Sequence, residues 1–200
     1  MKRLINVFLR AALAGVAISC GCVCFLSVGG VTGAVLFTFG LLTVVHYRFQ
    51  LYTGTAGFVS SWREVAELLL ILLGNIAGCL LVARGVAYAR PELGDAAEAL
   101  LTARLQRTLP GAFILAMGCG FIMTTAVAFA RKDKFLPLLF GVPCFIMCGF
   151  LHSIADACYY LMSPCQFLAS HWAAVLSLYL TIVLGNFVGC NLYRVGNVCA

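Results

Sequence analysis

Charged side chains are scarce in this chain of 200 residues. Only 13 are Lys or Arg and 7 are Asp or Glu, so 10% of the chain is charged while 63% is hydrophobic. A soluble domain of this length needs more charge to keep its surface hydrated. The scarcity therefore indicates an all-α polytopic membrane protein, long enough for about six spans of ~20 residues. We expect a single transmembrane domain over residues 1–200.

Other shortages narrow the function. With three histidines, two of them near predicted span ends, a haem protein lacks paired axial ligands, and we expect no cofactor. No recognisable catalytic group of Ser, Cys or carboxylates is present, so we expect no enzyme. The cations behind the net charge of +6 lie at the ends of apolar runs, which argues against nucleic-acid binding. The 11 cysteines fall mostly within apolar runs and are interpreted as packing residues; the alternative is a metal or redox site.

Apolar runs predict intact spans at about 7–28, 65–88, 110–130 and 169–193. A second run starts near residue 31 and is interrupted from His46 to Gly57, and a fifth is interrupted within 149–162. Non-helical backbone at membrane depth is tolerated only beside protein or water, so the first interruption is either an ordinary loop or a pore-facing break. The mixed-charge segment 90–109 predicts a short amphipathic helix at the membrane surface.

A short motif occurs twice. Leu-Gly-Asn, two residues, Gly-Cys, one residue and Leu begins at Leu73 and again at Leu184, each time after an interrupted span. We therefore predict two repeats, at about 7–88 and 109–194, joined by an amphipathic linker at 89–108. Three spans per repeat would give the repeats opposite orientations, an aquaporin-like architecture with a site near the midplane. The distribution of cations favours a multi-pass protein of the inner or plasma membrane with cytoplasmic N- and C-termini.

The second interruption carries two ionisable groups, His152 and Asp156. An ionisable side chain at membrane depth marks a pathway or a binding site by default. Histidine can offer a proton or a hydrogen bond without holding a permanent charge, which would help a weak-acid anion to cross together with a proton. The alternatives are a buried histidine bonded to a backbone carbonyl and an aspartate in a helix-helix contact. We expect Asp156 to be protonated, paired or turned away, because its charge would repel anions.

Four blocks of the sequence resemble the formate/nitrite transporter family, which includes hydrosulfide channels. They are 37–41 with 51–54, 73–79, 184–189, and the string Gly-Phe-Leu-His-Ser-Ile-Ala-Asp at 149–156. The resemblance implies six helices per subunit with broken second and fifth helices, and a homo-pentamer in the lipid bilayer with one pore per subunit. It also implies transport of small monovalent anions of the formate, nitrite or hydrosulfide class, with no nucleic-acid partner.

The resemblance also assigns roles to single residues. His152 would be the central pore histidine, Thr53 its partner, and Arg104 a cation near the outer entrance, where the family usually has lysine. The residues expected to line the constrictions are Phe37, Leu41, Leu51, Tyr52 and Phe145. Several positions depart from the family pattern, which has Glu at Leu151, Asn at Asp156, Asn-Trp at Gly120 and Phe121, an acidic residue at Gln50 and a small residue at Arg48. The alternatives are an aquaporin-like channel for a neutral solute, although the Asn-Pro-Ala pair is absent, and a non-transporting structural relative.

Overall fold

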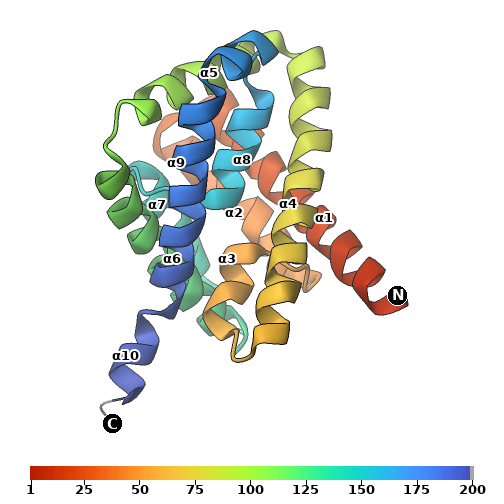
Figure 1. The fold of residues 1–200 in the computed structure, drawn as a ribbon, viewed down its shortest axis with the longest axis vertical. Coiled ribbons are helices and arrows are strands. Elements are labelled where there is room, and N and C mark those ends of the chain that lie inside the picture. Colours follow the sequence, from red (N-terminus) through yellow and green to blue (C-terminus); the bar gives the residue numbers. More distant parts are fainter. Residues whose placement is uncertain (199–200) are drawn as a thin grey trace.

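Helices make up nearly all of the computed structural model, which describes residues 1–198 and contains no strand in that range. Four helices are long and apolar enough to cross a membrane by length and composition. They are α1 (Lys2–Val28), α4 (Trp62–Ala89), α6 (Leu109–Ala130) and α9 (Cys165–Asn191). Helix α1 packs along α4, and α6 packs along α9 (Figure 1). The predicted all-α membrane architecture is confirmed.

The remaining helices include two interrupted pairs. In the first pair, α2 (Gly30–His46) is followed after a short loop by α3 (Tyr52–Thr55) and the 3-10 helix η1 (Ala56–Phe58). In the second, α7 (Leu136–Met147) is followed by α8 (Ser153–Met162). Each loop contains a residue with a left-handed backbone, Arg48 at φ 54° and Gly149 at φ 70°. Both interruptions therefore share one left-handed position in the loop.

Two further helices complete the chain. Helix α5 (Pro91–Leu105) occupies the segment predicted to be amphipathic, and it lies across one end of the molecule (Figure 1). Its buried residues are Leu93, Gly94, Ala97 and Leu101, whose spacing of three or four places them on one helical face. Helix α10 (Tyr193–Val198) follows α9. Helix α9 begins at Cys165, after its N-cap Pro164 and four residues before the predicted start of the sixth span.

Glycines of the repeated motif allow the long helices to pack closely. A Cβ atom added at Gly78 on α4 would overlap the carbonyl oxygen of Ala12 on α1. In the same way, a Cβ atom at Gly189 on α9 would overlap the carbonyl oxygen of Met117 on α6. Small residues at such crossings let two backbones approach within a bilayer. The matched glycines therefore set the spacing of both long-helix pairs.

The asparagine of the first motif holds the first interruption in place. Asn75 is fully buried, and its Nδ2 donates to the carbonyl oxygens of Ala11 and Gln50, each at 2.8 Å. Its Oδ1 accepts from the backbone N–H of Tyr52 at 2.9 Å. One amide group thus satisfies backbone groups that the broken helix leaves without helical partners.

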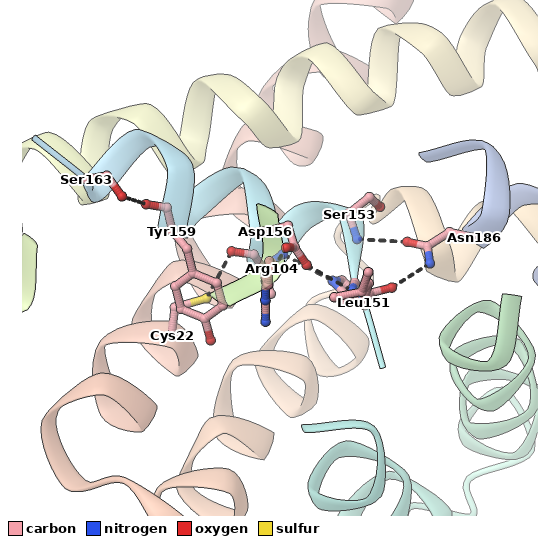
Figure 2. A network of polar contacts seen from close by, with 10 residues as sticks. Cys22, Arg104, Leu151, Ser153, Asp156, Tyr159, Ser163 and Asn186 are labelled. Carbon is pink, nitrogen blue, oxygen red and sulfur yellow. Dashed lines mark hydrogen bonds and ion pairs between the residues drawn. The ribbon is translucent and has the colours of Figure 1, made fainter. Parts of the chain in front are cut away.

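The asparagine of the second motif makes the equivalent contacts. Asn186 is also fully buried, and its Nδ2 donates to the carbonyl oxygens of Ala116 and Leu151, each at 2.8 Å. Its Oδ1 accepts from the backbone N–H of Ser153 at 2.8 Å, as Figure 2 shows. In both halves, therefore, a buried asparagine of the long helix hydrogen-bonds the backbone at the interruption.

Candidate functional site

His152 lies at the second interruption, as the N-cap residue of α8. Its Nδ1 accepts from the backbone N–H of Ala155 at 3.2 Å, and its Nε2 lies 2.9 Å from Oγ1 of Thr53 on α3. Because Nδ1 is an acceptor, a neutral ring carries its proton on Nε2 and donates it to Thr53. The threonine hydroxyl then keeps its own hydrogen for another acceptor. The His152–Thr53 pair thus joins the two interrupted helices.

Aromatic rings surround this polar pair. Phe145 stacks on the His152 ring with centroids 5.4 Å apart and an interplanar angle of 22°. Phe37 meets the Phe145 ring edge-on, with centroids 5.9 Å apart. His152 is only 2% exposed and Thr53 is fully buried. The pair is therefore a small polar point within an apolar constriction.

Two cavities approach the pair. The α5 cavity, of about 180 Å³, lies under α5 and is lined by residues that include Arg104, Arg107, Phe145, Gly149, His152 and Asp156. The α3 cavity, of about 630 Å³, is lined by residues that include Leu41, Arg48, Leu51, Gly54 and Arg131. Helix α5 lies at the top of the view in Figure 1, and α3 lies below it, toward the middle of the molecule. His152 borders the α5 cavity, and Gly54, the residue after Thr53, borders the α3 cavity.

Asp156 is fully buried and uses both of its carboxylate oxygens. Oδ1 accepts from Nη1 of Arg104, while Oδ2 accepts from the backbone N–H of His152 at 3.1 Å (Figure 2). The Arg104 guanidinium also lies 5.1 Å from the ring centre of Tyr159. Of the three states that the sequence left open for Asp156, the structure has the paired one.

Tyr52, which was expected to line a constriction, is held by two hydrogen bonds. Its hydroxyl donates to the carbonyl oxygen of Val183 on α9 at 3.1 Å, and its backbone N–H binds Asn75. It is not among the residues that line the α5 or α3 cavity, so its contacts connect α3 to α9. Leu41 and Leu51 line the α3 cavity, and Phe145 lines the α5 cavity.

Sequence reasoning missed two features of the site. Arg107 lines the α5 cavity with Arg104 from the turn that follows α5, and its place only three residues after Arg104 was a signal that the two could lie close together. The cap that Ala155 donates to His152 follows from the helix break at that residue, which the sequence placed only approximately. Leu151, which stands where the resembled family has Glu, is buried beside the site and binds Asn186 through its carbonyl.

Comparisons with known proteins place this chain in a family. A family model described as "Formate/nitrite transporter" matches residues 1–197, whereas no curated protein matches. A solved "Pentameric formate channel with formate bound" has a TM-score of 0.83 and 23% identity, covering 99% of this chain and 97% of that one. A solved "FNT family ion channel" has a TM-score of 0.85 and 20% identity, covering 98% and 90%. The chain therefore belongs to the formate/nitrite transporter family of membrane proteins.

Proposed function

We propose that this protein is a transmembrane channel or transporter for small monovalent weak-acid anions of the formate, nitrite or hydrosulfide class. The observation that carries the proposal is the buried hydrogen bond of 2.9 Å between His152 and Thr53, in an apolar region between two cavities. Family membership supports it, and one solved structure with the same fold is described as a formate channel with formate bound. Small anions and protons are the proposed substrates.

The hydrogen-bond chain suggests how an anion would cross. Moving a bare anion through a constriction of Phe and Leu costs several kcal/mol. The N–H of Ala155 fixes the His152 ring, the ring donates to Thr53, and the Thr53 hydroxyl is free to donate to the anion. A donor at this point would lower the cost, because hydrogen bonds to charged groups are among the stronger ones.

The same chain bears on the source of the proton. A neutral His152 holds one ring proton, so giving it away would leave an imidazolate. A second proton would have to displace the N–H of Ala155 from Nδ1 and so weaken the cap of α8. Of the two roles expected for His152, the geometry favours hydrogen bonding, with the proton entering from solution alongside the anion.

The assembly and orientation complete the proposal. The matched contacts of Asn75 and Asn186 support two repeats, at about 7–88 and 109–194, within one domain. We propose that the repeats have opposite orientations in a cell membrane, that both termini are cytoplasmic, and that the protein is a homo-pentamer with one pathway per subunit. The solved formate channel, described as pentameric, supports the last point.

Uptake of radiolabelled formate into proteoliposomes tests the function. We expect wild-type vesicles to take up formate faster than empty vesicles, and Thr53→Val to lose about tenfold or more of that rate. The loss corresponds to a hydrogen bond to a charged group, worth ~1.5–3 kcal/mol. Thr53→Ser keeps the hydroxyl and should retain most of the rate. Wild-type uptake no faster than that of empty vesicles would reject the proposal.

A parallel measurement addresses the neutral-solute alternative. Stopped-flow light scattering on the same vesicles measures water permeability. High water permeability without formate uptake would favour an aquaporin-like channel, and neither activity would favour a structural relative. Size-exclusion profiles of Thr53→Val and wild type should coincide, which would assign the lost uptake to the hydroxyl rather than to misassembly.

A further inference from the structure

We propose that Arg107, and not Arg104, supplies the positive charge that attracts an incoming anion to the α5 cavity. The inference rests on the proposed function and identifies the residue that sets anion recruitment at this end of the pathway. It follows from the contacts of each cation near α5. Arg104 was the cation expected from the sequence, so the inference changes the assignment.

Two arginines near α5 bind other groups and do not line the α5 cavity. Nε of Arg90 lies 2.8 Å from a carboxylate oxygen of Glu92, and neither residue lines the α5 cavity. Nη1 of Arg84 donates to the backbone carbonyl oxygen of Ser163 at 3.3 Å, also outside that cavity. The cations that remain to act on an anion in the cavity are Arg104 and Arg107.

The charge of Arg104 is neutralised by Asp156. The arginine side chain is 16% exposed and the aspartate side chain is fully buried, so the two opposite charges are held together with little water around them. Asp156 cannot turn away freely, because its second oxygen accepts from the backbone N–H of His152 and caps α8. An approaching anion therefore meets a compact pair of opposite charges whose fields largely cancel. A carboxylate from the chain already occupies the guanidinium that a substrate anion would bind.

Arg107 is available by contrast. It is exposed and lines the same cavity. Its Nη2 lies 3.4 Å from the position that a Cβ atom would take on Gly149, three residues before His152. No carboxylate lies within ion-pair distance of Arg107 among the residues described here. Its positive charge at the cavity wall is therefore uncompensated by a direct partner.

The size of the effect follows from Coulomb's law. One unit charge about 6 Å from an anion, in a medium as polar as water, changes the local anion concentration by about threefold, and more in a less polar mouth. The effect must weaken with salt, because the screening length falls from about 30 Å at 0.01 M to about 8 Å at 0.15 M. A change in the apparent KM for formate at low ionic strength is the expected signature.

The test compares charge removal at two positions. We expect Arg107→Gln to raise the apparent KM for formate uptake at least about threefold at 0.01 M ionic strength, and much less at 0.15 M. Arg90→Gln removes the same charge from the same end but outside the cavity, and should leave the KM unchanged. Unchanged KM values for Arg107→Gln at both ionic strengths would overturn the inference.

A second substitution should restore the low KM that Arg107→Gln loses. A misfolded protein would not show this gain. Asp156→Asn releases the charge of Arg104, so the double variant Arg107→Gln, Asp156→Asn should regain a low KM and its dependence on salt. The Asn side chain can still accept from the N–H of His152, which preserves the cap of α8. A double variant that remains as weak as Arg107→Gln would show that Arg104 is not a substitute and would contradict the charge argument.

A measurement of formate binding without transport tests this inference separately from the proposed function. Saturation-transfer NMR on the formate proton, with purified protein in detergent, reports weak binding without transport. Binding that falls in Arg107→Gln at low salt supports the inference even where wild-type vesicles show no uptake, which would reject transport alone. Absence of both binding and uptake in the wild type would reject both.

Discussion

Replacement of Asn186 by alanine is the most direct test of how the interrupted helices are held. The variant leaves three buried backbone groups without their side-chain partner, the N–H of Ser153 and the carbonyl oxygens of Ala116 and Leu151. A buried polar group without a partner costs ~1–3 kcal/mol. Ala116 lies within α6, where its carbonyl keeps a helical bond, so its share is smaller. We expect a total loss of about 3–6 kcal/mol, a large part of the ~5–15 kcal/mol that stabilises a typical protein.

Thermal unfolding in detergent measures this loss. For a chain of this size, 3 kcal/mol corresponds to a midpoint about 6 °C or more lower. Asn75→Ala should match Asn186→Ala, because Asn75 makes the same three contacts at the first interruption. Asn191→Ala is the control, since Asn191 is only partly buried and binds two carbonyl oxygens. We expect it to lower the midpoint by a few degrees at most.

The result that would refute this reasoning is equally specific. If Asn186→Ala unfolds at the same temperature as Asn191→Ala, water or a rearranged backbone must replace the amide at no cost. The matched contacts would then be incidental to stability. If Asn75→Ala and Asn186→Ala differ widely, the two halves do not use one device, and the argument from repetition fails.

Three further predictions concern single positions and pH. Gly78→Ala should lower the unfolding midpoint by the equivalent of about 1–3 kcal/mol or prevent folding, because its Cβ would overlap α1, whereas Gly85→Ala has open space and should be tolerated. Arg48→Gly should raise the midpoint by the equivalent of about 0.5–1 kcal/mol, since glycine adopts the observed φ of 54° without strain; an unchanged or lower midpoint would contradict this. Formate uptake should be faster at the lower of two external pH values if a proton enters with the anion, and a rate independent of pH would argue for movement of the anion alone.

Much of the architecture was predictable from local sequence. The scarcity of charge and the apolar runs indicated a membrane protein, because a long apolar helix satisfies its own backbone hydrogen bonds and can lie in lipid. The interruptions near His46 and His152 were visible because polar residues and glycines stop an apolar run. The repeated motif was also visible in the sequence, but the contacts that it makes were not. The sequence shows that Asn75 and Asn186 recur, whereas only packing shows which backbone groups they bind.

What the sequence determined by itself was the set of helices, their two interruptions and the presence of an ionisable pair in an apolar run. The tertiary structure alone decided the partners: Thr53 reaches His152 across 99 positions of sequence, and Arg104 reaches Asp156 across 52. The physical reason is one of range. Hydropathy and backbone preference act over a few residues, whereas the meeting of two interrupted helices depends on how closely the glycine-lined long helices pack. That packing assigned Arg104 to Asp156 and left Arg107 at the cavity wall without a carboxylate partner among the described residues.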